Sequence, residues 1–106
     1  MACKYNVNMS AISFEWDEKK STSNKKKHGV SFEEAQTVFA DENALLIHDP
    51  DHSDEEDRFV MIGLSDRLRV LIVCHCYRRG KAVIRIISAR KAMGSEQKQY
   101  WERWSK

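Results

Sequence analysis

The sequence predicts an α+β domain with a mainly antiparallel sheet and the element order β-α-α-β-β-β-β-α. Two segments of helical character follow the first strand, and four apolar segments of strand length come after them. The junctions between the last strands are short enough for hairpins, which join antiparallel neighbours. With 106 residues, 42% of them apolar, the chain has the size and composition of one globular domain.

The N-terminal part of the chain divides into an extension and a strand. Residues 1–11 show no apolar periodicity, and we expect residues 1–12 to form a poorly ordered extension. Residues 13–106 then form the single folded domain. The first strand is ISFEW, residues 12–16, in which apolar and polar side chains alternate.

A polar helix is expected after this strand. Asp17 can cap its N-terminus, and Gly29 can end it in the left-handed backbone conformation. The helix has no apolar stripe, although packing of an apolar face normally stabilises a helix of about eleven residues. Four polar side chains fall within one sector of roughly 100°: Lys20, Asn24, Lys27 and His28. This sector is either a solvated surface or one that holds RNA phosphates.

The second helix is amphipathic. Ser31 and Glu34 form a capping box, in which the serine bonds forward and the glutamate reaches back. Apolar residues then recur with helical spacing; they are Phe32, Ala35, Val38 and Phe39. We expect this helix to end near Ala40.

The rest of the chain reads as four strands and a final helix. The strands are rich in β-branched residues and cover residues 44–48, 58–65, 69–77 and 82–88. The last helix starts at Ser95 and carries Tyr100, Trp101 and Trp104 at helical spacing. These aromatic side chains can pack on the sheet or form a patch for a partner, and the pattern leaves both roles open.

Charge is distributed unevenly along the chain. Residues 1–57 hold 6 Lys and 13 Asp or Glu, a balance of −7, whereas residues 58–106 hold 12 Lys or Arg and 3 Asp or Glu, a balance of +9. All eight arginines lie at position 58 or later. Either the second half forms a basic surface for phosphates, or the two halves neutralise each other in the fold.

The composition gives little support to a metal, a cofactor or a membrane. Cys3, Cys74 and Cys76 lack the spacing of a zinc site, so we expect free thiols. The acidic segment HDPDHSDEED offers metal-ligating atoms at His48, Asp49, Asp51 and His52. It departs from a calcium loop because Asp54 and Val60 stand where glycine and glutamate are needed. The longest apolar runs are too short to span a membrane, and we expect a cytoplasmic protein without a cofactor.

Three stretches of the chain resemble one family of bacterial proteins. They are FEWDEKKSTSNKKKHGVSFEEAQTVFAD, SDEEDRFVMIGLS and VIRIISARKA, followed by Glu96 and Tyr100. In this order and spacing they resemble the BrnT toxins over about residues 14–101. KHGVSFEEA and RIISARKA are the most specific parts of the resemblance.

The resemblance implies a fold, an activity and a partner. BrnT toxins have a compact RelE-like α+β fold and act as ribonucleases that arrest translation. A cognate antitoxin, BrnA, blocks the toxin and supplies a ribbon-helix-helix DNA-binding dimer. A BrnT-like chain would therefore bind RNA directly, and operator DNA only through its antitoxin.

Metal-independent cleavage of RNA has definite chemical needs. The substrate's 2′-hydroxyl is the nucleophile, so the enzyme must supply a base, cations for the developing phosphorane charge, and an acid for the leaving oxygen. Histidine suits proton transfer, and arginine matches the geometry of phosphate. We expect catalytic roles for Lys27, His28, Glu56, Arg85 and Arg90. We expect RNA-binding roles for Lys20, Asn24, Arg58, His75 and Arg78.

Structural roles remain open for several of these residues. Arg85 interrupts an apolar strand, and a salt bridge with Glu56 would explain it as well as catalysis. Arg90 can cap a helix, and His75 can be a satisfied strand residue. A three-residue hairpin loop, 79–81, would place His75 opposite Arg85, whereas a two-residue loop would separate them. A non-catalytic module that binds the antitoxin or RNA, acting in operon repression, is the alternative function.

Overall fold

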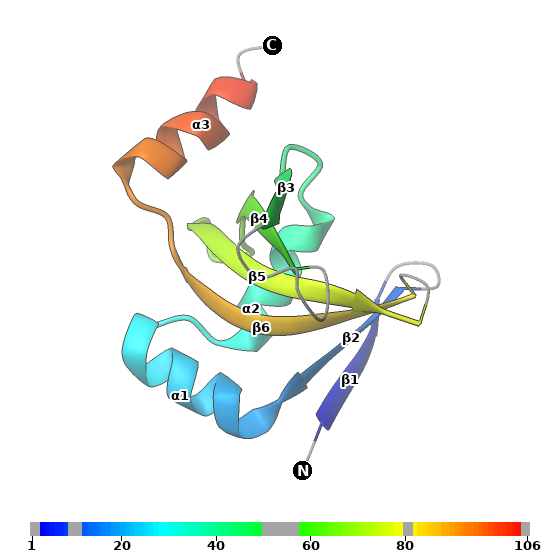
Figure 1. Cartoon of the computed structure of the whole chain (residues 1–106). Helices are drawn as coiled ribbons and strands as arrows, with labels where there is room; N and C mark the ends of the chain where they lie inside the picture. Colours follow the sequence, from blue (N-terminus) through cyan, green and yellow to red (C-terminus); the bar gives the residue numbers. More distant parts are fainter. Residues whose placement is uncertain (1–2, 9–11, 50–57, 80–81, 105–106) are drawn as a thin grey trace.

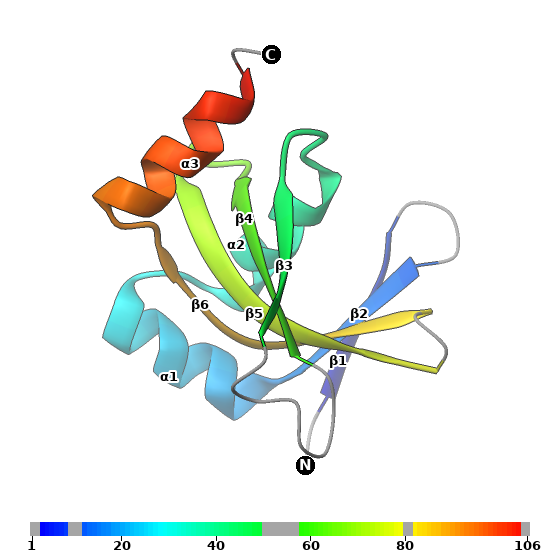
Figure 2. The same cartoon turned by 45° about the horizontal axis from the view of Figure 1, so that its top comes forward.

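The protein has a mixed six-stranded sheet with helices on both faces (Figures 1 and 2). The computed structural model describes residues 3–8, 12–49, 58–79 and 82–104. The strands are β1 Cys3–Asn8, β2 Ile12–Asp17, β3 Leu45–Asp49, β4 Arg58–Leu64, β5 Val70–Arg78 and β6 Val83–Lys91. The helices are α1 Glu18–His28, α2 Phe32–Thr37, the 3₁₀ turn η1 Val38–Ala40, and α3 Gly94–Trp104.

The sheet confirms the expected α+β class and its mainly antiparallel pairing. The strand order is β1-β2-β6-β5-β4-β3, and only the β2–β6 pair is parallel among the described strands. The predicted element order was incomplete because it lacked β1. Residues 3–8, expected to be poorly ordered, pair antiparallel with β2, and such long-range pairing leaves little trace in a local sequence pattern.

The caps confirm both predicted ends of α1 and the predicted start of α2, whereas α2 ends at Thr37 and continues as η1 to Ala40. The Asp17 side chain accepts a hydrogen bond from the Lys19 N–H at 2.9 Å. Gly29 ends α1 with a φ of 73°, in the left-handed region. Ser31 Oγ accepts from the Glu34 N–H at 3.1 Å, which is half of the expected capping box.

The Glu34 carboxylate does not complete the capping box, contrary to our expectation. It is buried and accepts hydrogen bonds from Arg69 and, at 2.7 Å, from Ser65. Arg69 also donates to the Gly29 carbonyl at 3.1 Å. Burial raises the pKa of Glu34, but these hydrogen bonds and the charge of Arg69 outweigh it and hold the pKa below its usual value. The ion pair thus joins α2 to the β4–β5 turn and to the end of α1.

Two apolar clusters lie on opposite faces of the sheet. The larger one is covered by α1, α2 and η1 and includes the residues of the predicted α2 stripe. The smaller one lies under α3; it consists of Ile62, Val70, Ile72, Ala92 and Tyr100. The Tyr100 hydroxyl donates to Asp41 at 2.6 Å, whereas Trp101 and Trp104 are 44% and 53% exposed. Tyr100 is therefore a core residue, and the two tryptophans form an exposed surface.

No helix among the described residues is both long and apolar enough to cross a membrane.

Candidate active site

A bulge in β6 decides which way its arginines face. Cys74 pairs with Ser88 and His75 pairs with Ile86, so Ile87 is an extra residue in the ladder. Arg85 and Arg90 are five positions apart, and strict alternation would place them on opposite faces of the sheet. The bulge reverses the alternation between them. Both arginines consequently share the face that α3 covers in part.

Charged residues form a row across this face. Arg85 of β6 pairs with Cys76 of β5, which pairs with Arg58 of β4; Arg58 in turn pairs with Asp49 of β3. On the other side Arg85 pairs with Glu15 of β2. Directly paired residues project to the same side of a sheet. Arg58 and Arg85, predicted on separate strands, therefore belong to one surface.

Glu15 holds Arg85 in place. Its carboxylate is largely buried and accepts a hydrogen bond from Arg85 Nη1 at 3.0 Å. Arg78 Nε lies 3.6 Å from the same carboxylate oxygen. Sequence reasoning proposed Glu56 as the partner of Arg85, and Glu56 lies outside the described residues. Glu15 was missed, although a carboxylate between the aromatic residues of FEW was a signal of a buried ion pair.

Arg90 forms a two-pronged ion pair with Glu96. Both hydrogen bonds measure 2.8 Å, and the Met93 N–H donates to Glu96 at 2.8 Å. These bonds raise the pKa of Arg90 and lower the pKa of Glu96, so both groups stay charged. Arg90 thus acts on the cap of α3 through Glu96, as the capping interpretation suggested. Its side chain remains 38% exposed and accessible to a ligand.

A groove of about 380 Å³ lies beside Arg90, between α3 and the sheet. Its walls come from β3, β4, β5, β6 and α3. They are formed by Ile47, His48, Asp49, Val60, Ile62, Ile72, Arg90, Glu96 and Gln99. The groove combines an apolar floor with charged and amide side chains at its rim.

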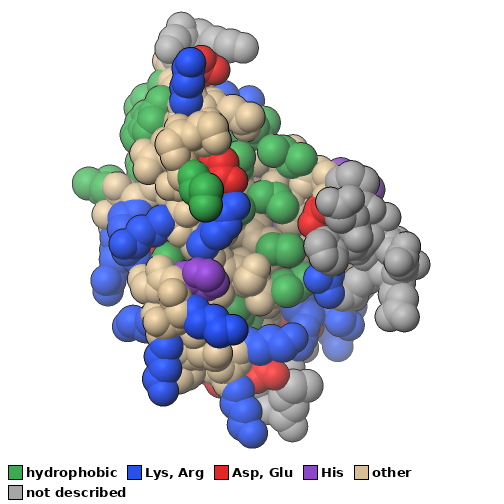
Figure 3. Space-filling view, turned by 60° about the vertical axis from the view of Figure 1, so that its left-hand side comes forward, with side chains coloured by type: hydrophobic (Ala, Val, Ile, Leu, Met, Phe, Trp, Pro, Cys, Tyr) green, Lys and Arg blue, Asp and Glu red, His purple; other side chains and the backbone are tan. Residues whose placement is uncertain are grey.

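Lys20, Lys27 and His28 lie on the exposed surface of α1. This helix packs over the opposite face of the sheet from α3, next to β6 (Figures 1 and 2). Figure 3 shows Lys and Arg side chains spread over this side of the molecule, with a histidine among them. The predicted catalytic residues that the structure describes therefore fall into two groups. Arg85 and Arg90 lie on the face that α3 covers in part, called the arginine face below, and Lys27 and His28 lie at the end of α1.

Asn24 was expected to bind RNA, but it is a buried structural residue. Its side-chain amide donates to the carbonyls of Val30 and Ala89, both at 2.8 Å, and accepts from the Ala89 N–H at 3.2 Å. The described β2–β6 pairing ends at Arg85, before Ala89 is reached. Asn24 thus supplies the hydrogen bonds that a neighbouring strand would otherwise give. Ser21 similarly accepts from the Phe32 N–H at 3.3 Å.

His75 was also expected to bind RNA, and the structure places it in the core with no exposed surface. Its ring contacts Phe39 at a centroid distance of 4.8 Å and Tyr77 at 5.3 Å. Burial lowers the pKa of His75 to about 4, so the ring is neutral near pH 7. Arg78 pairs with Val83, so neither loop length considered for the β5–β6 hairpin was right, and His75 lies opposite Ile86 rather than Arg85.

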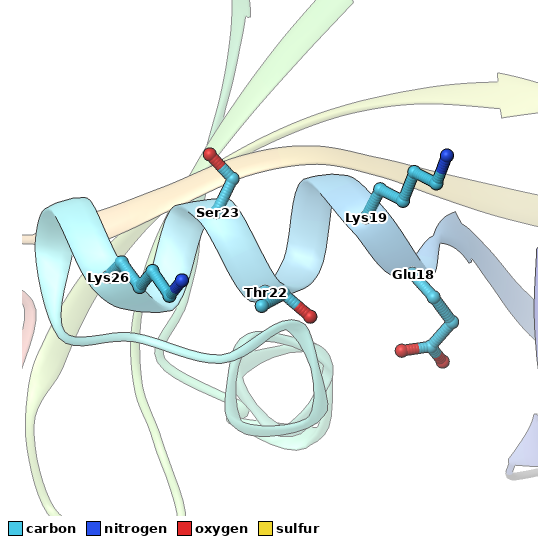
Figure 4. Close-up of a pocket in the computed structure, with 5 residues that line it drawn as sticks. All are labelled: Glu18, Lys19, Thr22, Ser23 and Lys26. Atoms are coloured by element: carbon cyan, nitrogen blue, oxygen red, sulfur yellow. The ribbon is translucent and has the colours of Figure 1, made fainter.

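A shallow hollow on α1 is a weaker candidate site. Figure 4 shows that all five of its labelled side chains come from this one helix; they are Glu18, Lys19, Thr22, Ser23 and Lys26. A site built from a single helix surface encloses little of a ligand. None of these residues belongs to the predicted catalytic set.

The described residues contain no group of three or more His, Cys, Asp or Glu side chains placed to hold a metal ion. Asp51 and His52 of the acidic segment lie outside the described residues. Cys74 and Cys76 are free thiols. Burial raises the pKa of Cys74, so this thiol is protonated near pH 7 and is a poor nucleophile.

Comparison with known protein families gives a match over most of the chain. Residues 16–96, which are 81 of the 106 residues, match the family model described as the ribonuclease toxin, BrnT, of type II toxin–antitoxin systems. No curated protein matches the chain. The matched segment includes α1, the Arg90–Glu96 pair and all of the charged row except Glu15.

Proposed function

Since the chain belongs to the BrnT family of ribonuclease toxins of type II toxin–antitoxin systems, we propose that it cleaves RNA without a metal ion and thereby arrests translation. The observation that carries this proposal is the gathering of Arg58, Arg85 and Arg90 on one face of the sheet. Guanidinium groups on a shared face suit a phosphate backbone, because each is a fixed cation with several N–H donors.

The arginines would stabilise the negative charge that develops on the phosphorus oxygens. Arg85 is the strongest candidate because Glu15 holds its guanidinium in place before substrate arrives. A preorganised cation stabilises a transition state without the cost of reorientation. Arg58 and Arg78 would hold the flanking phosphates, and Arg90 the phosphate nearest to α3.

Proton transfer is assigned to the end of α1. His28 and Lys27 are the exposed ionisable groups of the KHG motif, and Lys20 lies two turns earlier on the same helix. Arg69 fixes this end of α1 through the Gly29 carbonyl. An RNA strand that crosses β6 beyond Arg85, where the described pairing with β2 ends, would meet both groups of residues. Glu56 remains a further catalytic candidate.

The proposed setting is that of a cytoplasmic toxin with a RelE-like fold. A BrnA-like antitoxin with a ribbon-helix-helix domain would block the toxin and carry the complex to operator DNA. Trp101 and Trp104 suit contact with this partner because they are exposed and adjacent, with ring centroids 5.6 Å apart.

The test is an RNA cleavage assay in EDTA. We expect the wild type to leave 2′,3′-cyclic phosphate and 5′-hydroxyl ends. His28→Ala and Arg58→Ala should reduce the rate by about 100-fold or more. Arg85→Lys, which keeps a charge beside Glu15, should lose activity while the protein stays folded. Arg67→Ala, at an exposed turn residue, is the matched control and should cleave like the wild type.

A non-catalytic antitoxin-binding or RNA-binding module is the second candidate function. It is favoured by the separation of His28 from the arginine face, and by the ion pairs that Arg85 and Arg90 already form. In that case the folded wild type would leave RNA intact with and without added metal, yet bind its antitoxin. Cleavage only with added metal would instead contradict the metal-independent mechanism.

A further inference from the structure

The groove under α3 has an apolar floor that runs from buried side chains at its base to a partly exposed one at its β3 end. Ile62 and Ile72 are paired across β4 and β5 and lie at its base. Val60 and Ile47 extend this floor toward β3, where Ile47 is 39% exposed. An apolar strip that becomes exposed at one end, beside charged residues, suits a flat, partly apolar group.

The groove adjoins the arginine face. Val60 in its floor lies two residues along β4 from Arg58, which is roughly 7 Å along a strand. Arg90 forms part of the wall. Its bonds to Glu96 and to the Lys91 carbonyl use three N–H donors, and a guanidinium has more than three. A phosphate at Arg90 would therefore place its attached nucleoside at the mouth of the groove.

An amide side chain completes the groove. Gln99 projects from the exposed side of α3 and lines the wall, one residue before the buried Tyr100. An amide both donates and accepts hydrogen bonds, as the polar edge of a nucleobase does. Tyr100 is held by its hydrogen bond to Asp41, so Gln99 is presented from an anchored turn of the helix.

We propose that this groove binds one unpaired base of a single-stranded RNA, with its plane on the apolar floor and its polar edge at Gln99. The inference rests on the proposed ribonuclease function and names the part of the substrate that the site recognises. Its volume of about 380 Å³ lies within the usual range of small-molecule sites. Single-stranded RNA is the substrate form whose bases are free to enter such a groove.

The floor is tested with a matched pair of variants. Ile47 and Leu46 are neighbours on β3, exposed to 39% and 47%, but only Ile47 lines the groove. The probes are fluorescent 2′-fluoro RNA octamers of a single base, which bind without being cleaved by 2′-hydroxyl attack. Ile47→Ser should weaken binding about tenfold, as expected when a base loses its stacking surface. Leu46→Ser should stay within about twofold of the wild type.

Discrimination among the four bases is tested with variants of α3. Gln99→Ala should bring the dissociation constants of the four octamers to within about twofold of one another, because the hydrogen bonds that discriminate bases are lost. Gln97→Ala is the control, since Gln97 bonds the Ala92 carbonyl and does not line the groove. Its spread of dissociation constants should equal that of the wild type.

These outcomes separate the inference from the proposed function. If the protein does not cleave RNA but binds the octamers in a way that depends on Ile47 and Gln99, base binding in the groove is supported and the ribonuclease activity is refuted. RNA cleavage together with octamer binding that neither Ile47→Ser nor Gln99→Ala changes would refute base binding in the groove and support the ribonuclease function. Loss of antitoxin binding in Ile47→Ser, with unchanged RNA binding, would also overturn the inference.

Discussion

Replacing Asn24 by alanine tests whether α1 is held by hydrogen bonds instead of an apolar face. The variant removes three hydrogen bonds, two to carbonyls at 2.8 Å and one from an N–H at 3.2 Å. Each is worth about 1 kcal/mol, and burial of the orphaned groups of Val30 and Ala89 adds to the loss. We expect the free energy of unfolding to fall by about 3 kcal/mol, a large part of the stability of a small domain.

The assay is urea unfolding followed by the fluorescence of the tryptophans, one of which, Trp16, is fully buried. The midpoint should fall at constant slope. Ser23→Ala changes an exposed residue of the same helix and should stay within about 0.5 kcal/mol of the wild type. If the free energy of unfolding of Asn24→Ala falls by less than about 1 kcal/mol, these hydrogen bonds do not hold α1. If instead the variant binds RNA more weakly at unchanged stability, Asn24 has the RNA-binding role expected from the sequence.

Three further predictions concern buried ionisable groups. Burial lowers the pKa of His75 to about 4 from an ordinary 6.5, so the unfolded chain binds more protons than the folded one below pH 6.5. The free energy of unfolding should therefore fall by about 2 kcal/mol between pH 8 and pH 5. In urea titrations at these two pH values, His75→Phe should lose most of this difference. The pKa of Glu34 is below its ordinary value of 4.5, so its pairing with Arg69 stabilises the fold above that pH and is lost on further acidification. Glu34→Gln should be less stable than the wild type at pH 7, and its stability should change less below pH 4.5. Both are measured by circular dichroism. Tyr100→Phe removes the hydrogen bond to the Asp41 carboxylate and should cost about 2 kcal/mol by thermal unfolding, and an unchanged melting temperature would contradict this role.

Local signals account for most of the helix and strand assignments. Asp17, Gly29 and Ser31 act through backbone groups within four residues of themselves, so their caps could be read from the sequence. The apolar strands were also found close to their observed limits. β1 was missed because its place in the sheet depends on pairing with β2.

The candidate site was only partly predictable. Sequence reasoning selected Arg58, Arg85 and Arg90 because arginine suits phosphate, and the structure brings them to one face. It could not separate buried from exposed polar residues on α1, because Asn24 and Lys20 share one angular sector of the helix. Which of them meets the sheet depends on how α1 lies against β6.

The sequence by itself determined most of the elements, the caps at Asp17, Gly29 and Ser31, and the supply of cations, because these depend on neighbours along the chain. The tertiary structure decided which residues meet. One extra residue at Ile87 turns Arg90 to the face of Arg85, and the register of β5 places His75 in the core. Register and bulges follow from packing of the whole sheet, which is a long-range property, and a side chain's exposure follows from them.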